Sequence, residues 1–409
     1  MNLLKKYAQL ALRTGVNLQK DQGLLVQAPI EAIEFVRIVV KEAYQIGAKN
    51  VHVEWKDDDL TYLKMKHAPM EVLETFPKWR KDAMIGMVKD GYAVLNIYGE
   101  NPDLLKDIDG TRMAAVTMAS SKALKEYRDY MMNDKARWSI VGYPTTEWAE
   151  KIFPKLPADE AKDKLWKEIF RIARVDQEDP IDAWKKHNQL LKDAREYLNH
   201  KNYQKLHFQA EGTDLTIELP KGHIWHGGAA KATDNVTFNP NIPTEEVFSM
   251  PHKYGVNGKV TSTKPLSFQG QLIENFTLTF KDGKVSDYTC EKGEQALKQL
   301  LEADNDGASR LGEVALVPHE SPVSQAGIIF YNTLFDENAS CHIALGKAYP
   351  TNIKGGSDMN DKEMDQHGVN DSIVHEDFMI GSAEMDIDGI TVDGEREAIF
   401  RNGAWAVIF

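Results

Sequence analysis

The chain has 409 residues, of which 42% are hydrophobic and 27% charged, as is usual for a globular protein. This length is large for a single hydrophobic core, so we expect two domains of about 200 residues each. The net charge of −13 excludes nucleic acid as an expected partner, because binding to phosphates requires a basic surface.

The cysteine content indicates a reducing compartment. Cys290 and Cys341 are too few for a disulfide framework, and they are not spaced like the ligands of a thiolate zinc site. We therefore expect two reduced thiols in a cytoplasmic protein. No apolar run approaches the ~20 residues that span a bilayer, so no membrane partner is expected. Residues 3–11 have the spacing of an amphipathic helix and not that of a signal peptide.

The first half of the chain alternates between short apolar segments and helical segments. Strands are predicted at residues 24–28 and 51–55, joined by a helix that begins near Ile30 and ends at Gly47. A strand, a helix and a strand within about 30 residues are typical of a parallel crossover unit. We therefore predict an α/β layered domain with a largely parallel sheet over residues 1–200. The same alternation places helices at 79–89, 111–130 and within 158–200, and strands at 92–98 and 137–142.

Sheets of this kind often bind nucleotides, so the phosphate-binding loops matter. The chain contains no G-x-x-x-x-G-K-[ST] motif and no G-x-G-x-x-G motif after a predicted strand. This absence removes the usual reason to call the first half a nucleotide-binding domain.

Beyond residue 200 the pattern changes to short strands. A hairpin is predicted between residues 207–209 and 213–219, and a second hairpin turns at Asp282-Gly283. We expect residues 201–409 to form a mixed α+β domain. Its other predicted elements are strands at 260–263, 273–280, 314–317, 327–330 and 405–409, and a helix at 294–302.

Candidate functional side chains concentrate in this second half. In the apolar segment around His375-Glu376-Asp377, residues two apart share one face of a strand, so His375 and Asp377 point together and Glu376 points away. Such a pair serves either a cation or a His–Asp hydrogen bond, and both readings stay open. Glu313 enters another apolar run, where a buried carboxylate needs a cation or a hydrogen-bond donor.

Two further segments offer ligands. If residues 339–348 are helical, His342 and Tyr349 lie two turns apart on one face. Glu245 and Glu246 are adjacent at the start of a predicted strand, so only one of them can face a site. The sequence does not choose between these two glutamates.

The candidate set matches no common hydrolase motif. The thermolysin-type H-E-x-x-H and the serine-hydrolase G-x-S-x-G are both absent. The dispersed candidates are too many for a catalytic zinc with three protein ligands, and they fit two ions bridged by a carboxylate and a water. Oxygen and imidazole ligands favour Zn, Co, Mn or Mg.

Longer motifs surround these candidates. The second half contains PTEEVFSMPH (243–252), RLGEVALVP (310–318), LFDENASCHIALGKAY (334–349) and VHEDFMIGS (374–382). The first half contains QAPIEAIEFVR (27–37) and RVDQEDP (174–180). Together these segments closely resemble the family of aminopeptidase T, aminopeptidase S and PepS, which are dinuclear metalloaminopeptidases. The resemblance covers essentially the whole chain.

The resemblance implies a role for each candidate residue. The carboxylate that bridges the two divalent ions falls on Glu313, and the catalytic tyrosine falls on Tyr349. In the T-E-E-V motif the metal-binding carboxylate falls on the second glutamate. The implied metal ligands are Glu246, Glu313, His342, His375 and Asp377.

The resemblance also implies an activity. The family's fold is an α/β N-terminal domain with a C-terminal catalytic domain, in a cytosolic homodimer that encloses its active sites. The expected substrates are peptides with a free N-terminus, cut at the first peptide bond by a hydroxide generated at two ions. Tyr349 would donate a hydrogen bond to the oxyanion. The general base is not evident, and Glu245 is a candidate proton shuttle.

Two other function classes remain open at this point. A non-catalytic binding protein could hold a structural metal, although structural zinc sites are usually closed and four-coordinate. A dinuclear phosphoesterase would favour a basic pocket, which nothing in the sequence indicates. Residues 351–371, between Tyr349 and His375, are either a mobile lid or a solvated surface loop.

Overall fold

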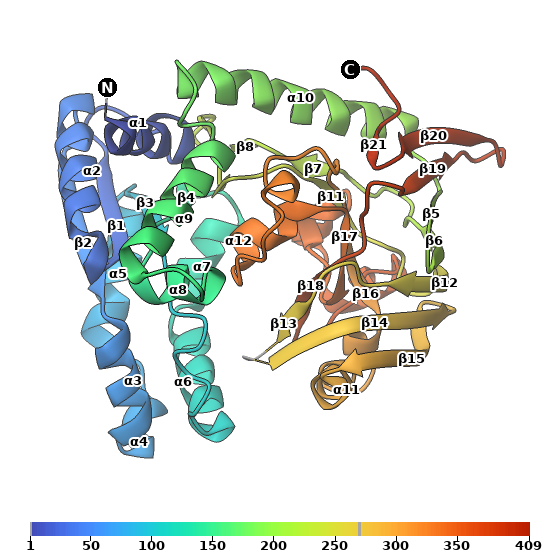
Figure 1. The fold of residues 1–409 in the computed structure, drawn as a ribbon, viewed down its shortest axis with the longest axis horizontal. Coiled ribbons are helices and arrows are strands. Elements are labelled where there is room, and N and C mark those ends of the chain that lie inside the picture. The colour runs from blue at the N-terminus through green and yellow to red at the C-terminus, as the bar shows by residue number, and fades with distance from the viewer. Residues whose placement is uncertain (1, 269–270) are drawn as a thin grey trace. The chain divides into compact units, whose positions relative to one another are not determined.

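The computed structural model describes residues 2–268 and 271–409 (Figure 1). The chain forms two compact units: unit 1 is Met1–His187 with Ala229–Pro243, and unit 2 is Asn188–Gly228 with Thr244–Phe409. The expected domain boundary near residue 200 stays a prediction. Among the described helices, none combines the length and apolar character that crossing a bilayer requires.

Unit 1 is built on a parallel sheet, as predicted. Strand β1 is the most buried of its strands, which explains its continuous apolar sequence. Its neighbours on either side, β2 and β3, are both parallel to it. The five strands, in spatial order, are β10 (Asn241–Ile242), β4 (Trp138–Gly142), β3 (Ala93–Tyr98), β1 (Gly23–Pro29) and β2 (Asn50–Lys56).

Helices connect the strands of unit 1. The predicted crossover is confirmed: helix α2 (Ile33–Ile46) joins β1 to β2 and ends at Gly47, whose φ of +107° is the left-handed conformation of a C-terminal glycine. Helices are present near the predicted 79–89 and 111–130, the second divided in two, and within 158–200; those at 58–67 and 70–73 were not predicted. The remaining helices are α1 (Leu3–Leu10), α3 (Asp58–His67), α4 (Met70–Leu73), α5 (Lys78–Lys89), α6 (Gly110–Ala123), α7 (Lys125–Met132), α8 (Thr146–Ile152), α9 (Ala158–Ile172) and α10 (Pro180–Lys201), of which α10 begins in unit 1 and ends in unit 2. A small ribbon joins β8 (Ala230–Lys231) and β9 (Thr237–Phe238).

Unit 2 contains a nine-stranded antiparallel sheet. The predicted turn at Asp282-Gly283 is confirmed, with φ of +50° and +79° at the two positions, as a two-residue hairpin requires. Helix α11 (Glu294–Leu301) follows the last strand of this hairpin. The strands run in the order β13 (Leu266–Phe268), β14 (Gln271–Lys281), β12 (Val256–Thr261), β6 (Thr213–Glu218), β5 (Lys205–Ala210), β19 (Asp386–Ile390), β20 (Arg396–Arg401) and β21 (Ala404–Trp405), with β15 (Lys284–Lys292) paired to β14.

A second sheet of unit 2 carries the candidate site. Its central strands β16 and β17 are buried along their whole length. Pairing is antiparallel throughout, and it places His342 opposite Ala315, and Asp377 opposite Ala344. Small partners at these register positions leave room for the functional side chains. The strands are, in order, β18 (His375–Met379), β17 (His342–Gly346), β16 (Leu311–Leu316), β11 (Val247–Ser249) and β7 (His226–Gly227).

The helix considered for residues 339–348 is not formed. This segment contains a 3-10 turn (Glu337–Ala339) and then strand β17. Ile343 and Leu345 are fully buried in the core of unit 2, and pairing with strands on both sides satisfies the backbone of β17. Gly346, with φ of +107°, lies against the carbonyl of Val374. A glycine is needed at this position because a side chain would collide with that carbonyl group.

Two predicted strands also need correction. Residues 327–330 form no strand, because Gly327 has φ of +63° and ends a 3-10 turn (Ser324–Ala326). In addition, the main-chain N–H of Phe330 donates its hydrogen bond to the carboxylate of Asp336 and not to a neighbouring strand. Helix α12 (Thr333–Asp336) follows. Of the strand predicted at 405–409, only Trp405 belongs to a paired strand, the two-residue β21.

The segment between Tyr349 and His375 is more ordered than either earlier reading assumed. It contains 3-10 turns at Pro350–Asn352 and Gly356–Asp358 and helix α13 (Asp361–Gln366). Its buried Ile353 and Val369 pack with Met250 and Ala348. The segment is thus anchored to the core and is not a plain solvated loop, while its movement as a lid stays a prediction.

Candidate metal centre

The structure brings the five predicted ligands together in unit 2. They come from four neighbouring strands, or from the residue that precedes one: Glu246 stands immediately before β11, Glu313 is on β16, His342 on β17, and His375 and Asp377 on β18. Their nitrogen and oxygen atoms form two groups in which all atoms lie within 4.8 Å of one another. The groups are Glu246, Glu313 and His342, and Glu313, His375 and Asp377.

Glu313 belongs to both groups because its two oxygens face different partners. Glu313 Oε1 lies 3.7 Å from His342 Nε2, and Glu313 Oε2 lies 3.5 Å from His375 Nε2. Glu246 Oε2 lies 3.2 Å from the same nitrogen of His342. A carboxylate that presents one oxygen to each of two neighbouring sites has the geometry of a bridging ligand.

Both imidazoles are held in one tautomer by the main chain. Nδ1 of His342 lies 3.1 Å from the carbonyl oxygen of Ser340, and Nδ1 of His375 lies 2.7 Å from that of Lys347. A carbonyl only accepts hydrogen bonds, so Nδ1 is the donor in each ring. In the neutral rings Nε2 therefore carries the lone pair, and it faces the carboxylates. Metal-binding histidines are commonly oriented in this way.

The three buried carboxylates of the cluster have only the imidazoles of His342 and His375 close to them. Glu246 and Glu313 are buried, and Asp377 Oδ1 is a buried atom without a hydrogen-bond partner. Within the described residues, no lysine or arginine forms an ion pair with these three side chains. Burying three carboxylates beside only two imidazoles leaves an excess of negative charge, which is costly. The donor set and the orphaned oxygen therefore fit a divalent cation.

The pKa values of the cluster follow from burial and from mutual repulsion. Burial, together with the charges of Asp377 and Glu246, raises the pKa of Glu313 to about 7. Burial disfavours the charged form of His342, but hydrogen bonds to Glu246 and Glu313 outweigh it and raise the pKa of this imidazole well above its ordinary value. The cluster therefore retains protons near neutral pH that a bound cation would displace.

Tyr349 lies beside the cluster. Its ring centroid is 4.9 Å from that of His375 and 6.3 Å from that of Phe248. Burial and then the carboxylates of Glu313 and Asp377 raise its pKa above the ordinary value. The side chain therefore remains a protonated phenol that can donate a hydrogen bond.

The structure distinguishes the two adjacent glutamates. Glu246 faces His342, whereas Glu245 belongs to neither ligand group. The main-chain N–H of Glu245 donates to the side chain of Asn338 at 2.6 Å, which fixes the backbone at this point. A part for Glu245 in proton transfer stays a prediction.

Sequence reasoning missed one acidic residue, Glu337. It begins the 3-10 turn before β17, and its pKa is raised well above the ordinary value by burial and then by the charges of Glu246 and Asp377. Its place in the DENASCH motif, five residues before His342, was the available signal. The expected helix over 339–348 hid this relationship, because the turn and the strand together bring Glu337 back to the cluster.

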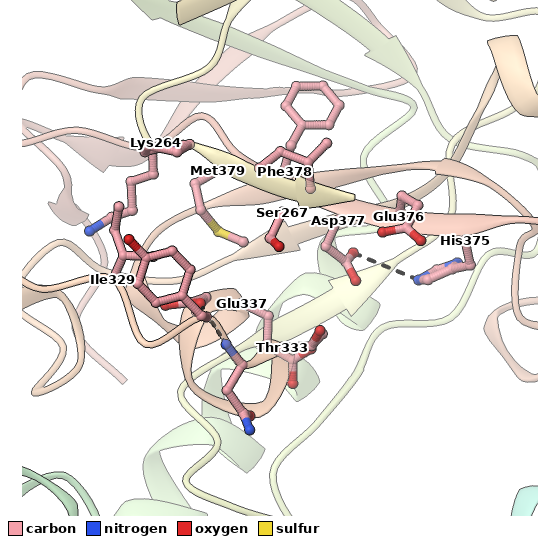
Figure 2. Close-up of a pocket in the computed structure, with 15 residues that line it drawn as sticks. Lys264, Ser267, Ile329, Thr333, Glu337, His375, Glu376, Asp377, Phe378 and Met379 are labelled. Carbon is pink, nitrogen blue, oxygen red and sulfur yellow. Dashed lines mark hydrogen bonds and ion pairs between the residues drawn. The ribbon is translucent and has the colours of Figure 1, made fainter. Parts of the chain in front are cut away.

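A cavity of about 230 Å³ adjoins the cluster. Glu337, His375 and Asp377 line it, and Glu376, which belongs to neither ligand group, lines it as well. Figure 2 shows Asp377 and His375 directed toward each other from β18, with Glu337 facing them from another segment. The candidate centre thus has an open side that can admit a substrate.

An α/β unit, an α+β unit and a buried carboxylate–imidazole cluster beside a cavity are compatible with the class of metal-dependent hydrolases. The profile of the Peptidase M29 family, described as thermophilic metalloprotease (M29), matches residues 1–405. The chain belongs to this family and is a peptide hydrolase. The resemblance inferred from the sequence motifs is confirmed.

Individual relatives match over almost their entire length. The chain is 56% identical over 403 residues to Aminopeptidase 2 of Geobacillus stearothermophilus, covering 98% of this chain and 97% of that protein. It is 51% identical over 403 residues to Aminopeptidase AmpS of Bacillus subtilis (strain 168), covering 98% of each. The solved structure of wild-type AmpT from Thermus thermophilus matches with a TM-score of 0.93 at 40% identity, covering 99% of each chain. The predicted fold class is thereby confirmed.

Proposed function

We propose that this protein is an aminopeptidase that removes N-terminal residues from peptides with the help of two divalent ions. The observation that carries the proposal is the position of Glu313, whose two oxygens face two separate histidine nitrogens. The similar proteins from Geobacillus stearothermophilus and Bacillus subtilis are themselves named aminopeptidases.

Each ion would have its own set of ligands. Glu246, His342 and one oxygen of Glu313 would hold the first ion, and the other oxygen of Glu313 with His375 and Asp377 would hold the second. Among the neighbouring charges that raise the pKa of Glu337, that of Glu246 is the largest, so Glu337 lies beside the first position. Carboxylate and imidazole ligands suit Zn, Co, Mn or Mg.

The side chains of this protein divide the remaining tasks. When bound, a pair of divalent ions lowers the pKa of a water molecule toward 7 and polarises a carbonyl group. The phenol of Tyr349 would donate a hydrogen bond to the oxyanion that forms at the first peptide bond, a contribution of about 2.7–4 kcal/mol for one well-placed donor. The backbone bonds to Ser340 and Lys347 keep the two imidazoles oriented throughout.

The charge of the cavity supports a peptide amine over a phosphate ester. Four acidic side chains and a single lysine line the cavity, so acidic groups outnumber basic ones there. Negative potential attracts a cationic α-amine and repels a phosphate dianion. The same open cavity argues against a purely structural metal, whose site would be closed. The carboxylates are Asp336, Glu337, Glu376 and Asp377.

We further propose that the protein is a cytoplasmic homodimer, as the family resemblance implies. Both cysteines are free thiols in the structure, which agrees with a reducing compartment. Light scattering on the purified protein tests the dimer: a monomer mass at micromolar concentration would contradict it.

The activity is tested with three matched substrates. Leucine p-nitroanilide, its N-acetyl derivative and p-nitrophenyl phosphate are offered to protein that was stripped by a chelator and then reloaded with Zn, Co, Mn or Mg. We expect hydrolysis of the free-amine anilide alone, and only after metal is restored. Equal hydrolysis of the acetylated anilide, or faster hydrolysis of the phosphate ester, would contradict the proposal.

A further inference from the structure

Lys264 occupies a distinct position in the cavity beside the candidate metal centre. It follows strand β12 and is the only lysine or arginine among the residues that line the cavity. In Figure 2 it lies on the opposite side of the drawn pocket from His375. The cavity therefore has a carboxylate–imidazole side and a cationic side.

The ammonium group of Lys264 has no partner within the described part of the chain. It makes no hydrogen bond and no ion pair there, and the charge that acts on it is that of Asp336. The oxygens of Asp336 already accept hydrogen bonds from the main-chain N–H groups of Phe330, at 2.7 Å, and Asn332, at 3.0 Å. Asp336 thus holds its own turn together and does not neutralise the lysine directly.

Burial makes this arrangement costly in the absence of a ligand. Loss of water around Lys264 lowers the pKa of its ammonium below the ordinary value. An ammonium has three N–H donors. Leaving these donors without hydrogen-bond acceptors in a partly buried position is unfavourable. The position therefore favours an anionic acceptor that enters from the cavity.

The lining of the cavity is mixed, and apolar side chains contribute part of it. Pro265, Leu266, Ile329 and Met379 line the same cavity. A ligand that matches this lining has an amine end, an apolar middle and a carboxylate end. Small-molecule sites commonly combine an apolar lining with a few such polar anchors.

We propose that Lys264 binds a carboxylate of the substrate and thereby determines which peptides are cut efficiently. The inference rests on the proposed aminopeptidase function. The carboxylate comes from one of two sources: an acidic side chain on the first residue, or the free C-terminus of a dipeptide. Both sources offer the same charge-assisted hydrogen bond to the ammonium.

The test compares substrates that differ in one carboxylate. Metal-loaded wild-type protein, Lys264→Met and Lys264→Arg are assayed with glutamate p-nitroanilide and leucine p-nitroanilide, and with Leu-Gly and Leu-Gly amide. Lys259→Met is the matched control, because Lys259 is an exposed residue of β12 that does not line the cavity. Methionine keeps an unbranched chain without the charge, and arginine keeps the charge. Circular dichroism and metal content establish that each variant is folded and loaded.

We expect Lys264→Met to raise KM about tenfold or more for the carboxylate member of one pair. Its kcat and the KM of the uncharged partner should change less than twofold, Lys264→Arg should recover part of the loss, and Lys259→Met should behave as wild type. An effect on the anilide pair assigns the first side chain, and an effect on the dipeptide pair assigns the C-terminus. An equal loss on all four substrates, or no loss on any, would overturn the role of Lys264. Failure of the wild type to cut any substrate would instead contradict the aminopeptidase function, and with it the basis of this inference.

Discussion

His342 and His375 present their Nε2 atoms to opposite oxygens of a single carboxylate, at 3.7 Å and 3.5 Å from Glu313. The two rings stand on neighbouring strands, β17 and β18, and the carboxylate stands on β16. Three adjacent strands therefore carry the side chains of two candidate ligand groups that share Glu313. Because strands in a sheet hold their register through backbone hydrogen bonds, this spacing is a property of the fold.

Replacing Glu313 should affect both positions together. We expect Glu313→Gln to reduce bound metal from two ions to less than one and to lower kcat/KM at least 100-fold, because it removes the shared charge and one anionic oxygen from each ligand group. Metal analysis after gel filtration and a leucine anilide assay measure the two effects. Glu320→Gln is the control, since Glu320 is exposed. Retention of two ions with full activity would show that Glu313 is no bridge.

Replacing Tyr349 should separate catalysis from metal binding. Tyr349→Phe removes the phenolic donor and preserves the ring that packs on His375. We expect kcat to fall about 100- to 1,000-fold, the usual loss for one oxyanion donor, while the metal content stays at the wild-type value. Steady-state kinetics with parallel metal analysis test this, and an unchanged kcat would remove Tyr349 from the mechanism.

Replacing Glu337 should weaken metal binding more than folding. Its carboxylate lies near Glu246 and His342 without belonging to either ligand group. Removing one negative charge there should lower the affinity for the first ion about tenfold. Competition with a chromogenic chelator measures the affinity of Glu337→Gln, with the exposed Glu384→Gln as its matched control. Equal affinities in the two variants would limit Glu337 to a structural part.

The metal-free protein should lose stability as the pH rises. Burial raises the pKa of Glu313 in the folded protein from 4.5 to about 7, so the folded state holds more protons than the unfolded state within this window. The stabilisation is complete below the unfolded pKa and is lost as pH rises through the folded pKa. The raised pKa of His342 acts with the same sign.

A bound cation should reverse this dependence, because it displaces those protons and its affinity grows with pH. We expect the Tm of chelator-treated protein to be lower at pH 8 than at pH 6, and the Tm gain on adding metal to be larger at pH 8. Thermal melts at both pH values, with and without metal, provide the measurement. A gain in Tm that does not depend on pH would mean that the cluster carries no displaceable protons.

Local patterns were sufficient for much of the fold. The apolar run of β1, the glycine at position 47 and the Asp282-Gly283 turn each have a local physical cause, and all three appear as predicted. The pairing of His375 with Asp377 also followed from a local rule, since strand residues two apart share a face. These features depend on residues close in sequence, which is why the sequence was sufficient to predict them.

Tertiary pairing decided the features that local patterns missed. Residues 342–346 are a strand because β16 and β18 pair with them on either side. The sequence pattern of the segment itself does not show that these neighbouring strands are present. The choice of Glu246 over Glu245 likewise depends on where His342 stands across the sheet. Glu337 was missed for the same reason, because its distance to the cluster is set by a turn and a strand that the sequence presented as one helix.

Anomalous X-ray diffraction from crystals of the metal-loaded protein measures the number and positions of bound ions directly. We predict two anomalous peaks on either side of the Glu313 carboxylate, one beside Glu246 and His342 and the other beside His375 and Asp377. A single peak, or peaks away from Glu313, would contradict the proposal that this carboxylate bridges two catalytic ions.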